Sequence, residues 1–230
     1  MAQTKGKLIV IAGIDGSGKS EQTRRLVERL RAEGLVAGEE DFPQYESSFF
    51  GQTIGRYLRG EFGPASAVNG YLASVLYAGD RWEAKERMDA ALERGDVIVC
   101  NRYVSANLAH QGGKIASDEE REAFFKWDEE LEFGVFKIPR PDLVVFLWLP
   151  LDVAGQLVEK KAARDYLQGG KKDGHEADTS HLANAQRVYE HLCETRPNWH
   201  RVECVEGDRL LSIDQVAERV WETVRPVVAR

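Results

Sequence analysis

The chain has 230 residues, of which 43% are hydrophobic and 30% charged, and it contains three cysteines. This composition is that of a globular protein and excludes a disordered, collagen-like or disulfide-framed chain. The net charge of -7 opposes binding to nucleic acid, which requires a basic surface. The longest apolar run, residues 143–149, is far shorter than the roughly 20 residues of a membrane-spanning helix. We therefore expect a cytoplasmic protein without a nucleic-acid or membrane partner.

The first half of the chain alternates between strand and helix patterns. Residues 8–12 form a continuous apolar run, which is typical of a strand covered on both faces. A Gly-rich turn and a helix over 21–30 follow, and a weaker strand is predicted over 35–42. A short helix over 53–58 and a long helix over 67–94 complete this half. The predicted inner stripe of the long helix is Leu72, Val75, Leu76, Met88, Ala91 and Leu92.

The second half continues the alternation without a linker, so we expect one domain over residues 1–230. Buried strands are predicted over 96–100 and 142–149, with a helix from Ser117 to about 131 between them. Residues 160–178 are rich in Lys and Gly and are interpreted as a mobile loop or lid. Ser212 and Gln215 form a capping box for the last helix. Its apolar stripe is Ile213, Val216, Ala217, Val220, Trp221 and Val224.

Residues 13–20 match the phosphate-loop pattern G-x-x-x-x-G-K-[ST]. They follow a predicted strand and open a predicted helix, where successive backbone N–H groups can form a cradle for phosphate. In that arrangement Lys19 reaches the β- and γ-phosphates and Ser20 helps to hold Mg²⁺. The predicted ATP-binding residues are Gly13, Ile14, Asp15, Gly16, Ser17, Gly18, Lys19 and Ser20. GTPases, ATPases and kinases share this loop, so other motifs must identify the acceptor.

Four further motifs follow in order: Phe42-Pro43, Tyr77-Ala-Gly-Asp-Arg81-Trp82, Asn101-Arg102-Tyr103 and Gln111-Gly-Gly-Lys114. Together with the phosphate loop, this series resembles the thymidylate kinases, over nearly the whole chain. The resemblance implies a doubly wound five-stranded parallel α/β sheet of the P-loop nucleoside monophosphate kinase type, with a lid at about 160–178. It also implies a homodimer.

The resemblance further implies the reaction and its residues. The γ-phosphoryl group of ATP would pass to dTMP with the help of Mg²⁺, giving dTDP and ADP. The implied catalytic residues are Lys19, Asp15, Arg102 and Arg164, the last chosen over Lys171 and Lys172 as the cation that the lid supplies. The implied acceptor-binding residues are Asp15, Phe42, Pro43, Tyr77, Arg81, Arg102, Tyr103 and Gln111.

Within this set, Tyr77 would stack on the thymine, although its helical spacing fits core packing equally well. Tyr103 would crowd the ribose 2′ position, and the amide of Gln111 would reach the base. Arg102 comes directly after a buried strand, so it would stand at the carboxyl edge of the sheet, where open α/β folds place ligands.

Two departures from the family pattern leave alternatives open. Asn101 stands where the family usually has Asp, near Mg²⁺, and Gln44-Tyr45 stand where an arginine commonly follows Phe-Pro. Apart from these departures, a kinase for another pyrimidine (deoxy)nucleotide is one alternative. A nucleotide-binding regulator with little turnover is another.

Overall fold

The computed structural model describes residues 5–167 and 179–229. Its main sheet has five strands in the order β2-β3-β1-β4-β5, and all four neighbouring pairs are parallel. The strands are β1 (Lys7–Ala12), β2 (Ala37–Asp41), β3 (Val97–Asn101), β4 (Leu143–Trp148) and β5 (Trp199–Glu203). The predicted doubly wound five-stranded sheet is therefore confirmed.

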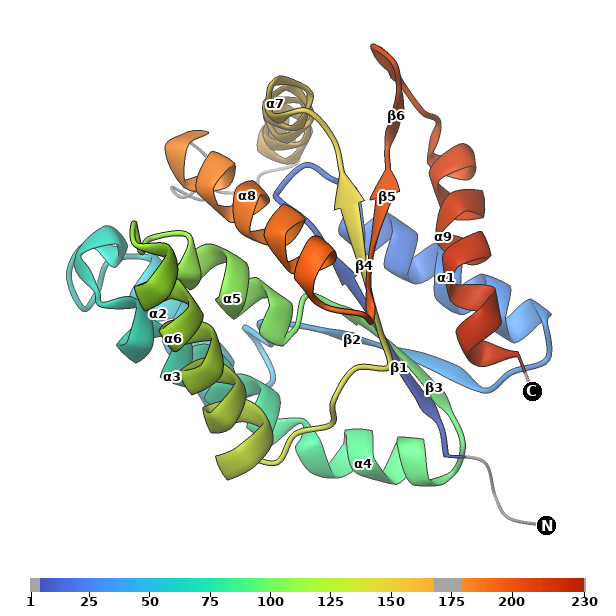
Figure 1. Ribbon diagram of the computed structural model, residues 1–230, viewed down its shortest axis with the longest axis horizontal. Coiled ribbons are helices and arrows are strands. Elements are labelled where there is room, and N and C mark those ends of the chain that lie inside the picture. The colour runs from blue at the N-terminus through green and yellow to red at the C-terminus, as the bar shows by residue number, and fades with distance from the viewer. Residues whose placement is uncertain (1–4, 168–178, 230) are drawn as a thin grey trace.

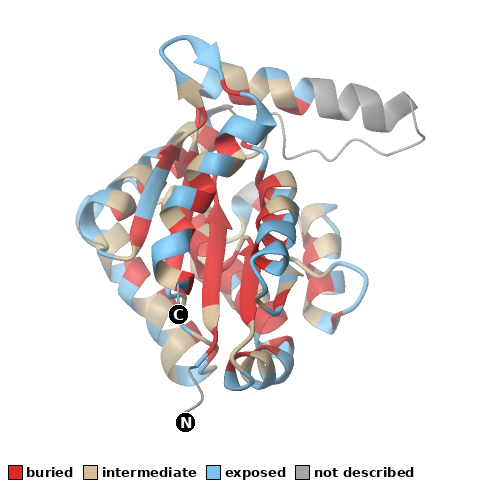
Figure 2. Ribbon diagram, turned by 90° about the vertical axis from the view of Figure 1, so that its right-hand side faces the viewer, coloured by how far each residue is buried: buried red, intermediate tan, exposed pale blue. Residues whose placement is uncertain are grey.

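Helices cover both faces of this sheet (Figure 1). On one side lie α1 (Lys19–Ala32) and α9 (Ile213–Val228), and on the other α5 (Val104–Gly112) and α8 (Thr179–Thr195). Outside α5 lie α2 (Phe49–Leu58), α3 (Gly70–Glu83) and α6 (Asp118–Glu129). The central strand β1 is at most 1% exposed from Leu8 to Ala12, and buried residues concentrate along the strands (Figure 2). None of the described helices is long and apolar enough to cross a membrane.

The sheet has one edge where its parallel strands end, called here the carboxyl edge, and an opposite edge where they begin; the two differ in what surrounds them. At the carboxyl edge, α7 (Leu151–Leu167) and the antiparallel hairpin of β6 (Val205–Glu206) and β7 (Arg209–Leu210) protrude (Figure 1). At the opposite edge β1 begins and α9 ends. The phosphate loop follows β1 and therefore opens at the carboxyl edge.

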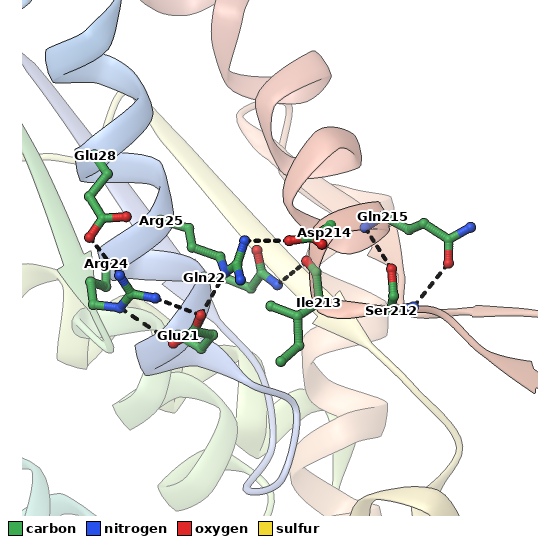
Figure 3. Close-up of polar contacts among 9 residues, drawn as sticks. All are labelled: Glu21, Gln22, Arg24, Arg25, Glu28, Ser212, Ile213, Asp214 and Gln215. Carbon is green, nitrogen blue, oxygen red and sulfur yellow. Dashed lines mark hydrogen bonds and ion pairs between the residues drawn. The ribbon is translucent and has the colours of Figure 1, made fainter.

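Polar contacts fix the start of α9 against the first turns of α1 (Figure 3). The side-chain amide of Gln22 donates to the carbonyl of Ile213 at 3.0 Å, and Arg25 pairs with Asp214 at 2.6 Å. Ser212 accepts from the N–H of Gln215 at 3.2 Å, while the Gln215 side chain accepts from the N–H of Ser212 at 3.0 Å. This reciprocal arrangement confirms the predicted capping box.

The predicted long helix over 67–94 is wrong. A 3₁₀ turn (Ala65–Ala67) is followed by two separate helices, α3 and α4 (Lys85–Glu93), which meet at the buried Ala84. Leu72, placed on the inner stripe, is 67% exposed, because Tyr71 turns inward and packs against Phe124 and Trp127 instead. The predicted stripe of the last helix also fails at Ile213, which is 53% exposed.

Two other segments differ from the expectation. The helix from Ser117 does not simply end near 131, because α6 continues into a π-helical turn, η2 (Glu130–Val135). Residues 160–167, assigned to the loop or lid, continue α7 as helix. The remaining lid residues, 168–178, lie outside the described residues.

Candidate active site

The phosphate loop adopts the backbone that its glycines allow. Gly13 has φ 152°, and a Cβ there would come within 2.5 Å of Ser17 Oγ and 3.0 Å of the Leu147 carbonyl. Gly18 has φ 83° and directly precedes α1, so the loop leads straight into the helix N-terminus. Side chains other than hydrogen would strain or block both positions.

The side chain of Lys19 folds back over the earlier residues of the phosphate loop. Its Nζ donates to the carbonyl of Ile14 at 2.9 Å and lies 3.5 Å from Asp15 Oδ1, and the residue is only 7% exposed. Its ammonium is thus held within the loop, at the place where bound phosphates would lie.

Asp15 and Arg102 form an ion pair across the carboxyl edge, from the phosphate loop to the end of β3. Burial opposes the charge of Asp15, but Arg102 and Lys19 hold the pKa of its carboxyl far below the usual range. Arg102 has φ 62°, in the left-handed region that non-glycine residues rarely adopt. Strain of this kind persists where the surroundings over-determine it, often at functional sites.

Two imidazoles lie close to this ion pair. Nδ1 of His110 on α5 is 3.2 Å from Nε2 of His181 on α8, and the two rings stack. Burial and the positive charge of Arg102 lower the pKa of His110 to about 3. His110 is therefore neutral at physiological pH, and it acts there as a packing and hydrogen-bonding group, not as a cation.

The ends of β2 and β3 form a second polar group beside the phosphate loop. Asn101 Nδ2 donates to Ser20 Oγ at 3.1 Å and to Asp41 Oδ1 at 2.8 Å. Asp41 and Asn101 are register partners on adjacent strands. The amide of Asn101 therefore connects Ser20, the last residue of the phosphate loop, to a carboxylate on β2.

The predicted acceptor-binding residues divide into two groups. Tyr77 is partly exposed, and Gln111 is buried with no partner for its Oε1, so both fit a ligand contact. Pro43 is half-buried and is joined to Phe42 by a cis peptide bond. Phe42 and Tyr103, in contrast, belong to the core.

The contacts of Phe42 and Tyr103 correct their predicted roles. Phe42 is 2% and Tyr103 0% exposed, and their rings lie 5.9 Å apart. The Tyr103 hydroxyl donates to the carbonyl of Pro139 at 2.9 Å. Because the Tyr103 side chain is buried and its hydroxyl is already hydrogen-bonded, it presents no surface to a sugar. The expected contact of Tyr103 with the ribose 2′ position therefore does not fit the structure.

Arg81 faces a buried carboxylate. Its Nε lies 2.9 Å from Glu132 Oε2, and its Nη2 pairs with Oε1. Asn107 Nδ2 donates to Glu132 Oε1 and to Asp128 Oδ1, both at 3.2 Å. All four side chains are at most 2% exposed. Burial and the nearby Glu132 raise the pKa of Asp128 to about 8. The described contacts of Arg81 are thus structural, and the expectation that it grips the acceptor phosphate gains no support from them.

Asp80 fixes the chain after Pro43. It is 1% exposed and accepts from the N–H of Gln44 at 3.0 Å and from the hydroxyl of Ser48. This carboxylate on α3 holds the loop between β2 and α2 against the helix that carries Tyr77.

Arg164, the predicted lid cation, belongs to the last part of α7, and its side chain lies outside the described residues, as do Lys171 and Lys172. Among the side chains that the structure describes, no group of three or more from His, Cys, Asp or Glu is placed to hold a metal ion.

Sequence reasoning missed four polar residues of this region: Asp41, Asp80, Asn107 and Glu132. Asp80 lies inside the quoted Tyr77–Trp82 motif, and Glu132 is a charged residue between Leu131 and Phe133. A single charge among apolar neighbours is a signal of a buried ion pair. The partner of each residue is distant in sequence, so no local pattern identifies it.

Comparison with known proteins gives consistent relatives. A family model described as thymidylate kinase matches residues 11–211. A thymidylate kinase of Mycobacterium tuberculosis is 31% identical over 186 residues, which cover 80% of this chain and 85% of that protein. The Homo sapiens thymidylate kinase is 35% identical over 152 residues, 66% of this chain and 65% of that protein. A solved structure of the Candida albicans thymidylate kinase matches with a TM-score of 0.70 and 24% identity, covering 97% and 92% of the two chains.

Proposed function

The chain belongs to the thymidylate kinase family, and from that membership we propose how its residues divide the work of the reaction. The enzyme transfers a phosphoryl group from ATP to dTMP, giving dTDP and ADP. The observation that carries the proposed division is the Asp15–Arg102 ion pair, which joins the phosphate loop to the residue after β3 at the carboxyl edge of the sheet.

The donor phosphates lie in the phosphate loop. The backbone N–H groups at the start of α1 and the ammonium of Lys19 bind the β- and γ-phosphates. Phosphoryl transfer depends on positioning and on neutralised charge more than on a strong base. Lys19, held by the Ile14 carbonyl at 2.9 Å, is positioned before the substrate arrives.

The acceptor lies beside Arg102. Its guanidinium binds the acceptor phosphate, and Asp15, which is ionised, holds this guanidinium and accepts a hydrogen bond from the acceptor sugar. Tyr77 stacks on the base and Gln111 pairs with its edge. Arg164, whose side chain lies outside the described residues, is the proposed cation that neutralises charge on the transferred group.

Mg²⁺ fits the residues at the ends of β2, β3 and the phosphate loop. Ser20 is exposed, and Asn101 is buried with an Oδ1 that has no described partner, so oxygen ligands of the kind that Mg²⁺ prefers are present. When bound, the ion neutralises negative charge on the phosphates. Ser20 would hold it together with the phosphates of ATP.

ADP production from Mg-ATP, measured with each nucleoside monophosphate in turn, tests the proposal. We expect turnover to be strongest with dTMP and absent in Lys19→Ala. A preference for a ribonucleotide would contradict the dTMP assignment. Nucleotide binding without acceptor-dependent turnover would identify a regulator.

A homodimer is part of the proposal. Four large apolar side chains are exposed on α2, α3 and η2, and α3 packs against each of the other two elements: Phe49 (71%), Leu72 (67%), Trp82 (50%) and Val135 (63%). A second copy of the chain that covers this apolar surface would remove it from water, which supports the proposed assembly.

A cytosolic location is also proposed. Cys100, Cys193 and Cys204 are free thiols. Reduced cysteines are typical of the cytosol, where disulfides rarely persist.

A further inference from the structure

β3 ends in an uncharged residue at a position where a metal-binding carboxylate would be expected. This strand lies beside β1, so its last residue stands next to the phosphate loop. In phosphate-loop enzymes, Mg²⁺ is held by the loop Ser or Thr and by an Asp at the end of a neighbouring hydrophobic strand. Here that residue is Asn101, whose amide carries no charge.

The adjacent strand supplies a carboxylate at the same level. Asp41 is the register partner of Asn101 and is the last residue of β2. One amide nitrogen of Asn101 donates both to Asp41, at 2.8 Å, and to Ser20, at 3.1 Å. Asp41 and Ser20 are exposed, whereas Asn101 is 6% exposed and its Oδ1 has no partner among the described residues.

Two of the other acidic groups nearby are already engaged, and Glu39, on the same face of β2, is exposed. Asp15 pairs with Arg102 and Lys19, and Glu40 pairs with Arg87 at 2.6 Å. Among the side chains that the structure describes, no lysine or arginine forms an ion pair with Asp41. Its carboxylate therefore stands next to Ser20 with one hydrogen bond, to Asn101, and with charge that no cation neutralises by direct contact.

We propose that Asp41 is the charged protein ligand of the Mg²⁺ that accompanies the nucleotide, and that Asn101 positions it beside Ser20. This inference rests on the proposed use of Mg-ATP. Mg²⁺ is bound through one or two carboxylates together with substrate phosphates, so one carboxylate from β2 completes the set that Ser20 and Asn101 begin. Compared with the usual arrangement in phosphate-loop enzymes, the carboxylate lies on the next strand of the sheet, β2 in place of β3.

Calorimetric binding of ADP with Mg²⁺ and with EDTA tests the inference without turnover. The ratio of the two dissociation constants measures how much the metal strengthens nucleotide binding. In the wild-type protein we expect Mg²⁺ to tighten ADP binding. In Asp41→Asn this ratio should fall by about ten-fold or more, as expected when a metal site loses a group that orients or ligates the ion. Binding in EDTA should not weaken, which shows that the variant is folded.

The exchange of the two side chains provides the sharper test. In the double variant Asp41→Asn/Asn101→Asp the carboxylate returns to β3, and the metal-dependent ratio should recover. Glu39→Gln is the matched control, because Glu39 is an exposed acid two residues earlier on the same face of β2. Its ratio should equal that of the wild type.

Two results would overturn the inference in distinguishable ways. If Ser20→Ala abolishes the Mg²⁺ effect while Asp41→Asn keeps it, the metal binds at the loop but not through Asp41. If Mg²⁺ leaves ADP binding to the wild-type protein unchanged, the proposed metal use itself is wrong.

Discussion

Asp15 has two partners of opposite charge, Arg102 and Lys19, and its replacement should reveal what the ion pair does. In Asp15→Asn the Arg102 guanidinium loses its charged partner, and the sugar loses an ionised acceptor. We expect kcat/KM for dTMP to fall by about 100-fold or more, comparable to the loss of one preorganised electrostatic group. KM for ATP should change less. Steady-state kinetics with Glu46→Gln, an exposed acid, as control would measure this, and an equal rise of KM for both substrates would contradict the assignment.

Glu132 holds a guanidinium that is 2% exposed, so it should matter for stability. Removing one partner of a buried ion pair costs about 3–5 kcal/mol, because the other charge stays buried. We expect Glu132→Gln to lower the free energy of unfolding by that amount in urea titrations. Glu206→Gln, which removes an exposed partner of Arg209, should show no measurable change. An unaltered Glu132→Gln midpoint would show that Arg81 does not depend on this carboxylate.

Asp128 should make stability depend on pH. Its folded pKa of about 8 lies above the ordinary value of 3.8, so the folded state retains a proton that the unfolded state releases between these values. The contribution of Asp128 is therefore fully present below pH 3.8 and is lost as the pH rises toward 8. Relative to the wild type, Asp128→Asn should gain about 1 kcal/mol per pH unit between pH 5 and 7. If the free energy of unfolding changed with pH in the same way in both proteins, the raised pKa of Asp128 would be refuted.

The start of α9 matters because it is tied to the helix that opens with the phosphate loop. Ser212 and Gln215 satisfy each other's backbone N–H groups, and Asp214 pairs with Arg25 of α1 (Figure 3). Ser212→Ala should cost about 1 kcal/mol of unfolding free energy, the usual loss at an N-cap. Thr53→Ala, an exposed hydroxyl inside α2, serves as the control and should be neutral or slightly stabilising. Equal midpoints for the two variants would show that the cap contributes nothing.

The π-helical turn η2 shows how a local departure from the α-helix can reposition a side chain. A single such turn within a helix shifts the residues that follow it around the axis. Here the turn carries Glu132 inward to Arg81, while Val135 remains 63% exposed. Without it, the regular spacing of α6 would distribute these residues differently between core and surface.

Assembly can be tested on the exposed apolar surface of α2, α3 and η2. Leu72→Ser/Trp82→Ser replaces two of its side chains and should shift a wild-type dimer to monomer in sedimentation velocity. Ile213→Ser is a matched control, since Ile213 is 53% exposed on α9, on the other side of the sheet. A monomeric wild type, or a dimer that survives the double change, would contradict the proposed interface.

Sequence reasoning predicts this molecule best where the signal is local. The phosphate loop is readable because its glycines, Lys19 and Ser20 are consecutive, and the strands are readable because buried parallel strands are continuously apolar. Leu72 and Tyr71 show the limit. Both fit a helical stripe, and the choice between them depends on Phe124 and Trp127, which are about 50 residues away.

The site follows the same rule. Asp15 and Arg102 were recognisable from motifs, whereas Asp41, Asn107 and Glu132 acquire their roles from partners on other elements. Tyr103 is the instructive failure. It directly follows Arg102 in the chain, but the left-handed backbone of Arg102 and the turn into α5 send its ring into the core, toward Pro139.

The position of the chain ends has a practical consequence. The protein has its candidate catalytic groups at one edge of the sheet, while β1 begins and α9 ends at the other (Figure 1). An affinity label, a fluorescent fusion or a linker to a solid support could therefore be attached through either end. The solid support would then lie on the side of the molecule opposite the candidate active site. Nucleotides would reach the immobilised enzyme from the open solution.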